Sequence, residues 1–200
     1  MMISEQIMSW LIKPALFVLC LVPLGLFALA VMSGELSADP IKDATLFTGD
    51  WTLRLILITL CVTPLRRLLG WVWLIKLRRM LGLYAFFYAL LHFTVWFWLD
   101  RELQLGEVIE DIIKRPYITV GFTAFIMLIP LAITSNKYSI RRLKQGWQKL
   151  HKLVYLIAGL GVLHFLWLVK SDVLEPAIYG VLLIILLGLR AWWERQAKTA

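Results

Sequence analysis

The sequence is poor in charge and in cysteine. Only 17% of its 200 residues are charged and two are cysteines, whereas 60% are hydrophobic and the mean hydropathy is +0.78. A soluble domain has about 25% charged and about 45–50% apolar residues. The shortage of charge therefore excludes a soluble globular enzyme and a disordered chain. Cys20 and Cys61 lie within apolar runs and form no Cys-x-x-Cys pair, which excludes a disulfide-stapled secreted module.

Apolar runs of about 20 residues recur along the chain, long enough for helices to cross about 30 Å of hydrocarbon. The runs are continuous rather than alternating, which favours helices over barrel strands. We predict an all-α fold, a polytopic bundle of six transmembrane helices in a single domain of residues 1–200. Asp39-Pro40 and Thr48-Gly49 are expected in the loop after the first span, and no internal repeat is apparent. The expected spans are 8–32, 51–69, 80–99, 118–134, 153–169 and 176–193.

The first span has a competing interpretation. Lys13, the following apolar stretch and the triplet Ala28-Leu29-Ala30 resemble a signal peptide with a cleavage site after small residues. However, Glu5 and Trp10 precede Lys13, and the apolar stretch is longer than is usual in signal peptides. We therefore expect a retained helix.

The loops differ sharply in charge, which predicts an orientation. Eleven of the 13 acidic residues fall in one set of connections, and the other set holds two basic loops without Asp or Glu. Lys and Arg in short loops remain in the cytoplasm, so both termini are expected there and the net charge of +8 reflects topology rather than nucleic-acid binding. The residues of the two basic loops are Arg66, Arg67, Lys76, Arg78 and Arg79, then Lys137, Arg141, Arg142, Lys144, Lys149 and Lys152.

The chain has only three histidines, and two of them are expected at equal depth. His92 follows Arg79 by 13 residues and His164 follows Lys152 by 12, on two spans that run in the same direction. If these basic residues mark one interface, the rings differ in depth by about 1.5 Å. Two level imidazoles on neighbouring helices suit the two axial positions of a haem iron. The alternative is that each histidine only hydrogen-bonds a neighbour inside the bundle.

His151 lies 13 residues before His164, about 20 Å away along a helix. This spacing suits a second redox centre near the cytoplasmic face. On a straight helix, however, the two rings would point about 140° apart, and Arg78 and Arg79 occupy the positions where a partner histidine is expected. His151 therefore shares a site with a non-histidine ligand, contacts a second cofactor or solvates the interface.

Several arginines are candidate partners of haem propionates or of a flavin phosphate, with lipid headgroups as the alternative. Lys114 and Arg115 are the candidates on the opposite side of the membrane. Phosphate-binding loops, dinucleotide fingerprints and hydrolase or metalloprotease motifs are all missing, so no nucleotide-oxidising module of its own is expected. The arginines on the basic side are Arg66, Arg67, Arg78, Arg79, Arg141 and Arg142.

Several short segments, taken in order, resemble the MsrQ (YedZ) family, the haem-binding membrane subunits of the bacterial periplasmic methionine sulfoxide reductase system. That family belongs to the ferric reductase-like transmembrane proteins, and the resemblance covers nearly the whole chain. Tyr155 and His164 follow at the expected distances. The segments are Ala38-Asp39-Pro40, Thr48-Gly49, Thr63-Pro64-Leu65, Arg78-Arg79-Met80-Leu81-Gly82-Leu83, Leu91-His92, Arg115-Pro116-Tyr117-Ile118-Thr119, Ala132-Ile133-Thr134-Ser135 and Trp147-Gln148-Lys149-Leu150-His151.

The resemblance implies a subunit of the bacterial inner membrane that passes electrons from respiratory quinones through haem b to a periplasmic molybdopterin-containing reductase. That partner repairs methionine sulfoxide in proteins. The family's haem-associated histidines correspond to His92, His151 and His164, and FMN is implied without a site. The wider superfamily uses four histidines, so three leave a second bis-histidine haem incomplete. Two other hypotheses are a stand-alone ferric or quinone reductase fed by a cytoplasmic flavin reductase, and a transporter or membrane scaffold without cofactor.

Overall fold

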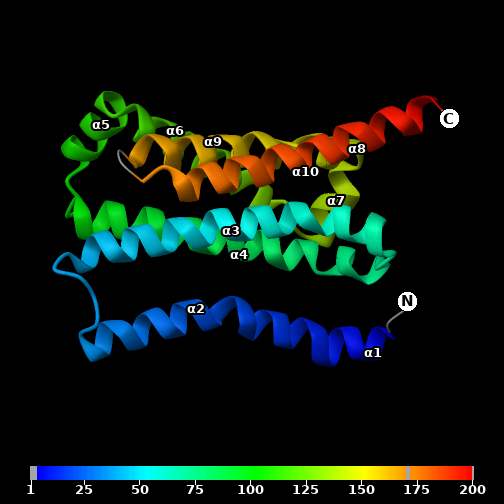
Figure 1. Ribbon diagram of the computed structural model, residues 1–200, viewed down its shortest axis with the longest axis horizontal. Coiled ribbons are helices and arrows are strands. Elements are labelled where there is room, and N and C mark those ends of the chain that lie inside the picture. The colour runs from blue at the N-terminus through cyan, green and yellow to red at the C-terminus, as the bar shows by residue number, and fades with distance from the viewer. Residues whose placement is uncertain (1–3, 170–171, 200) are drawn as a thin grey trace.

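The computed structural model describes residues 4–169 and 172–199, which form a bundle of long helices (Figure 1). Six of these helical spans are long and apolar enough to cross a membrane, which confirms the predicted fold class. The spans are Glu5–Ser33 (α1, Glu5–Ile7; η1, Met8–Ile12; α2, Lys13–Ser33), α3 (Pro40–Leu69), Arg78–Asp100 (α4, Arg78–Thr94; η3, Val95–Asp100), α6 (Pro116–Ile133), Gln145–Leu168 (α8, Gln145–His151; α9, Leu153–Leu168) and α10 (Leu174–Thr199). Shorter connecting helices are η2 (Val72–Lys76), α5 (Leu105–Lys114) and α7 (Lys137–Leu143).

The second span begins 11 residues earlier than its apolar run predicts. The Asp39 side chain accepts a hydrogen bond from the backbone N–H of Lys42 at 3.0 Å, and Pro40 takes the first helical position. Both features favour a helix start. Thr48 and Gly49 therefore lie inside α3, and the expectation of a loop there was wrong. Hydropathy missed this turn because its polar residues face the bundle interior, where Thr48 is buried.

Two antiparallel hairpins form the centre of the bundle: α3 packs against α4, and α6 packs against α9. The α10 helix covers α9 and α3. The first span is held partly through hydroxyl groups of α4. Tyr84 donates to the carbonyl of Phe17 at 3.1 Å, and the fully buried Tyr88 donates to the carbonyl of Cys20 at 2.8 Å. The remaining surface of the first span is largely apolar and exposed, as expected for a lipid-facing helix.

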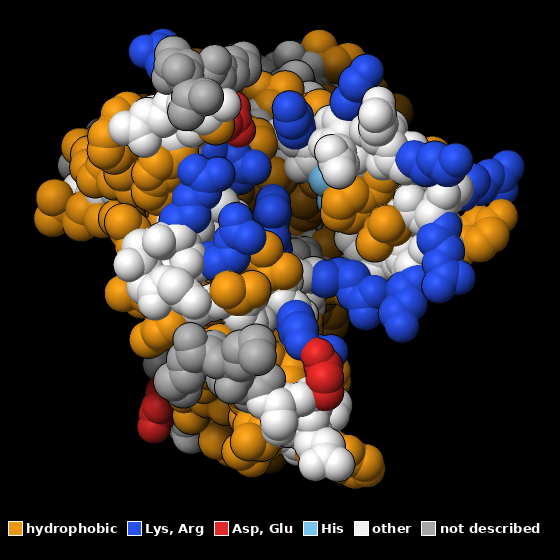
Figure 2. All heavy atoms as spheres, turned by 90° about the vertical axis from the view of Figure 1, so that its right-hand side faces the viewer, with side chains coloured by type: hydrophobic (Ala, Val, Ile, Leu, Met, Phe, Trp, Pro, Cys, Tyr) orange, Lys and Arg blue, Asp and Glu red, His pale blue; other side chains and the backbone are white. Residues whose placement is uncertain are grey.

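The two ends of the bundle differ in charge. Both termini lie at one end, here called the terminal end, and α5 lies at the other, the α5 end (Figure 1). Viewed from the terminal end, Lys and Arg side chains surround a hollow and few acidic side chains are visible (Figure 2). The basic loops after α3 and α6 therefore share one face, whereas most acidic residues lie toward the α5 end.

Candidate functional site

A cavity of about 290 Å³ lies within the central helices near the α5 end. Its wall is mostly apolar and is formed by the first turns of α3 and α6 and the last turns of α4 and α9. His92 of α4 and His164 of α9 both line it. The structure thus brings together the two histidines that the residue count places at equal depth.

The His92 ring is oriented by backbone groups of α3. Its Nδ1 lies 2.9 Å from the carbonyl oxygen of Thr45, one turn before Gly49. A carbonyl can only accept, so Nδ1 carries the hydrogen and Nε2 holds the lone pair of the neutral ring. A Cβ atom at Gly49 would lie 3.1 Å from the ring atoms Cε1 and Nδ1. Glycine here lets the imidazole lie directly against the helix backbone.

The His164 ring of α9 packs against the backbone of α6 in the same way. Its Nδ1 lies 2.6 Å from the carbonyl oxygen of Tyr117, one turn before Gly121. This bond again leaves the lone pair on Nε2. A Cβ atom at Gly121 would lie 2.6 Å from Nδ1 and 2.8 Å from Cε1 of His164, closer than real Cβ contacts. This glycine is required for the observed position of the ring.

The two histidine settings form an internal repeat that inspection of the sequence missed. Each histidine is 47 residues from the carbonyl that accepts from its Nδ1, and each carbonyl is followed four residues later by the packing glycine. The unit of carbonyl, glycine and histidine recurs 72 residues along the chain, in the α3/α4 hairpin and then in the α6/α9 hairpin. Comparing the sequence with itself at this offset would have paired Gly49 with Gly121 and His92 with His164.

The spacing of the two rings fits a pair of axial metal ligands. Their centroids lie 6.1 Å apart and their planes are inclined by 81°. A metal–imidazole bond is about 2 Å long, so a metal midway between two such rings separates their centres by roughly 6 Å. Within residues 4–169 and 172–199, no group of three or more His, Cys, Asp or Glu is placed to hold a metal ion. The pair therefore suits an iron whose equatorial ligands come from a flat macrocycle.

His151 lies elsewhere, in a second cavity of about 430 Å³ toward the terminal end. It ends α8, and the break at Lys152 before α9 supplies the irregular geometry expected near this residue. The ring stacks on Trp147 with centroids 3.9 Å apart, and Nε2 lies 3.0 Å from Thr134 Oγ1. Because that hydroxyl donates to the carbonyl of Pro130 at 2.6 Å, His151 Nε2 is the donor and Nδ1 holds its lone pair. His151 thus differs from the other two histidines.

The second cavity combines an apolar floor with cationic walls. Arg78, Arg79 and Lys152 line it, together with Arg190, and no Asp or Glu appears among its described lining residues. Arg79 precedes His151 by the 72-residue offset of the repeat, so an arginine stands where the repeat would put a fourth histidine. The side chains shared by both cavities are Ile56 and Leu128, which separate the two spaces.

Only some of the predicted arginine positions lie at a cavity. Arg115 lines the first cavity, whereas Lys114 forms an ion pair with Glu110 at 2.5 Å. Arg101, which sequence analysis did not single out, also lines the first cavity. Among the described residues, four of the expected arginines line neither cavity: Arg66, Arg67, Arg141 and Arg142.

Comparison with known proteins agrees with this architecture. The profile of the family described as "Ferric reductase like transmembrane component" matches residues 48–162. No solved structure matches the chain. Three similar proteins are each named "Protein-methionine-sulfoxide reductase heme-binding subunit MsrQ". The protein of Herminiimonas arsenicoxydans is 50% identical over 192 residues, covering 94% of this chain and 88% of its own length.

The other two relatives are similarly close. The protein of Xanthomonas campestris pv. campestris (strain 8004) is 55% identical over 166 residues, covering 83% of this chain and 76% of its own. That of Ralstonia nicotianae (strain ATCC BAA-1114 / GMI1000) is 48% identical over 185 residues, covering 91% and 85%. The identities, the matched lengths and the six spans agree, and the chain belongs to the MsrQ family of ferric reductase-like transmembrane proteins.

Proposed function

We propose that this chain is a membrane electron-transfer subunit in which His92 and His164 hold one haem b in the first cavity. Electrons come from respiratory quinones and leave to a periplasmic molybdopterin-containing subunit that reduces methionine sulfoxide in proteins. The observation that carries the proposal is the pair of Nε2 lone pairs on rings 6.1 Å apart in an apolar cavity. The names of the relatives, which describe heme-binding subunits of this reductase, support the same function.

When bound, haem supplies a one-electron carrier. The chain's own residues supply its position. The carbonyls of Thr45 and Tyr117 fix the tautomer and rotation of the two imidazoles, as outer hydrogen bonds do for most metal-bound histidines. The mostly apolar wall, which includes Phe93 and Phe125 with centroids 4.8 Å apart, suits the faces of a flat ring.

The test is the reduced-minus-oxidised optical spectrum of the full chain purified in detergent. We expect the α and β bands of a six-coordinate b-type haem, and loss of these bands together with lower haem content in His92→Ala and in His164→Ala. Gly159→Ala is the control, because a Cβ atom there would meet nothing within 4 Å; His151→Ala should keep the bands of this haem, since its ring lies in the other cavity. Bands that survive unchanged in both variants would remove the assignment. A colourless wild-type protein would favour the transporter or scaffold hypothesis.

The proposed direction of transfer follows from the charges of the two ends. With the basic loops in the cytoplasm, the terminal end and both termini face the cytoplasm of a bacterial inner membrane. The first cavity then lies in the half of the membrane nearer the periplasm, where the reductase subunit would bind. The rival function is a stand-alone ferric or quinone reductase fed by a cytoplasmic flavin reductase. The two are separated by the rate of haem reduction with a quinol and with a flavin reductase.

We also propose that the second cavity, with His151 in its wall, binds a flat anionic ligand. Four cations without a lining carboxylate, above an apolar floor, support this. FMN, which the family resemblance implies, and a second haem are the candidates; iron ligation through His151 Nε2 would require loss of its hydrogen bond to Thr134. Chromatography of the extracted cofactors tests this: Arg79→Gln should lower the content of one of them while the first haem remains.

A further inference from the structure

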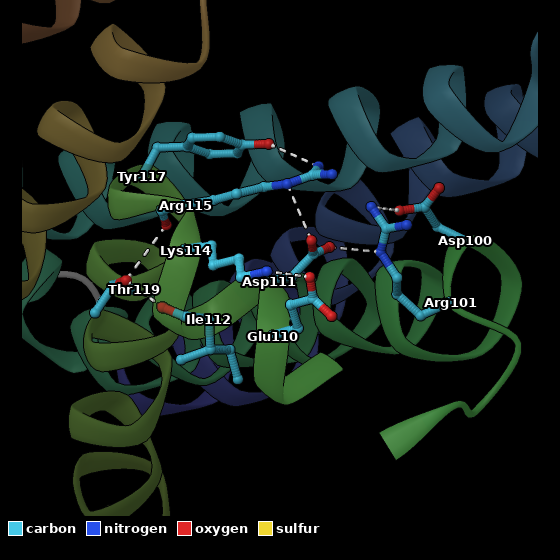
Figure 3. A network of polar contacts seen from close by, with 9 residues as sticks. All are labelled: Asp100, Arg101, Glu110, Asp111, Ile112, Lys114, Arg115, Tyr117 and Thr119. Carbon is cyan, nitrogen blue, oxygen red and sulfur yellow. Dashed lines mark hydrogen bonds and ion pairs between the residues drawn. The ribbon is translucent and has the colours of Figure 1, made fainter. Parts of the chain in front are cut away.

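A cluster of charged residues lies at the α5 end of the first cavity. Asp111 of α5 lies between two arginines that come from different connections (Figure 3). Its Oδ2 lies 2.7 Å from Nε of Arg101, which follows η3, and its Oδ1 lies 2.9 Å from Nε of Arg115, which precedes α6. Asp111 is only 8% exposed. By distance both contacts are ion pairs, and a buried carboxylate with an arginine at each oxygen positions both guanidinium groups.

This arrangement leaves donors available at the cavity. Each arginine is held through Nε, so its terminal amino groups are only lightly engaged. Arg101 Nη2 lies 3.3 Å from Asp100, and Arg115 Nη1 lies 3.4 Å from the hydroxyl of Tyr117. For the other terminal nitrogens, Arg101 Nη1 and Arg115 Nη2, no protein partner is seen in the described part of the chain. Both arginines line the same cavity as His92 and His164.

A third donor without a partner lies in the wall of the same cavity. The indole Nε1 of Trp96 is buried and has no hydrogen-bond partner among the described residues. Trp96 lies four residues after His92 and also lines the cavity. A buried N–H without an acceptor costs about 1–3 kcal/mol, and native proteins rarely leave one unpaired. Together with two guanidinium groups, this N–H indicates that a ligand oxygen completes the site.

We infer that the α5 end of the first cavity binds the carboxylate groups of its ligand, the propionates if that ligand is haem b. Arg101 and Arg115 contact the carboxylates, Trp96 donates a hydrogen bond, and Asp111 is a positioning residue that acts through the arginines. This inference rests on the proposed haem site of His92 and His164. The sequence makes Arg115 a candidate partner of a haem propionate. The structure adds a second arginine, Arg101, and the buried carboxylate of Asp111, which pairs with both arginines.

The test compares haem with its dimethyl ester, in which both propionates are methylated and neutral. Full-length chain, purified without haem in detergent, is titrated with each compound, and the ratio of the two affinities is measured. We expect wild type to bind haem about ten- to a hundredfold more tightly than the ester, the effect of losing a charge-assisted hydrogen bond. Arg101→Gln and Arg115→Gln should lose most of this preference while they bind the ester as wild type does.

Three further variants complete the design. Asp111→Asn should lower the haem-to-ester ratio because the guanidinium groups are no longer fixed. Glu110→Gln is its control: Glu110 is the neighbouring residue on α5, is exposed and pairs with Lys114. The hydrogen bond and the positive charge of Lys114 hold the pKa of Glu110 below its usual value. Glu110→Gln therefore removes one negative charge, but it should leave the ratio of haem to ester affinity unchanged. Trp96→Phe keeps the ion pairs and should lower the ratio severalfold.

The outcomes separate this inference from the proposed function. Equal affinity of wild type for haem and ester, or an equal loss of both affinities in the arginine and Asp111 variants, would show that the cluster only ties α5 to the bundle and would overturn the subsite. If a variant fails to fold, Trp96→Phe decides the matter, because an unchanged ratio there contradicts the inference. A wild type whose bound haem lacks bis-histidine bands refutes the proposed function instead.

Discussion

Replacing Gly121 by alanine is the perturbation for which the structure gives the clearest magnitude. The new Cβ would lie 2.6 Å from Nδ1 and 2.8 Å from Cε1 of His164, whereas ordinary contact begins at 3.4 Å. The ring must therefore move by about 0.8 Å, given that α6 holds the glycine backbone in place. Metal–ligand distances tolerate only about 0.2 Å. The displaced ring also loses its hydrogen bond to the Tyr117 carbonyl, which orients Nε2.

The expected result is loss of one axial ligand with retention of the fold. Gly121→Ala should convert the six-coordinate spectrum to that of a five-coordinate, high-spin haem, or lower the haem content at least severalfold, because outer contacts of metal ligands typically contribute 10–100-fold to affinity. The assay is the optical spectrum of purified oxidised and reduced protein, with haem quantified per chain. Helix content from circular dichroism should stay at the wild-type value.

Two other glycines make the test graded. Gly49→Ala puts its Cβ 3.1 Å from His92, so the ring must yield only a few tenths of an ångström and a partial effect is expected. Gly159→Ala is the control, because it lies on α9 near His164 and its Cβ would meet nothing within 4 Å. The order of effect should be Gly121, then Gly49, then Gly159 with none. An unchanged six-coordinate spectrum in Gly121→Ala would refute the packing argument.

Three further predictions concern the scaffold and its orientation. Tyr88→Phe removes the hydroxyl that donates to the Cys20 carbonyl at 2.8 Å; we expect a loss of about 1 kcal/mol and a fall of about 2–4 °C in the apparent unfolding midpoint, and no fall would mean that this bond does not hold the first span. Asp39→Ala removes the cap of α3 and should cost about 1 kcal/mol, seen as faster hydrogen exchange in the first turn of α3; unchanged exchange would contradict the capping role. For the orientation, a membrane-impermeant maleimide should label Glu35→Cys in intact cells and Lys144→Cys only after permeabilisation. The reverse pattern would invert the proposed topology.

Much of the fold could be predicted from the sequence because residues that face lipid must be apolar, and hydropathy measures this residue by residue. The spans near residues 80–99 and 118–134 match their helices within two residues at each end. The start of α3 could not be predicted in this way. Its first turns contain Thr45, Thr48 and Asp50, whose polar groups face the bundle rather than lipid, so the local composition is that of a loop.

The candidate site could be predicted only in outline. Counting residues from the basic ends of two spans places His92 and His164 at one depth, since helical rise is constant. The count cannot show which way a ring points, because rotation depends on the packing of α3 and α6. Contacts across the bundle, such as the ion pairs of Asp111 with Arg101 and Arg115, join residues whose sequence spacing carries no periodic signal.

The central claim is that His92 and His164 bind the same iron through Nε2. Low-temperature electron paramagnetic resonance of the purified ferric chain tests it most directly, because the signal depends on the spin state of the iron and, with two axial imidazoles, on the angle between their planes. With ring planes inclined by 81°, we expect a highly anisotropic low-spin signal in wild type that is lost in His92→Ala and in His164→Ala. A high-spin signal in wild type, or a low-spin signal that persists unchanged in either variant, would contradict the account.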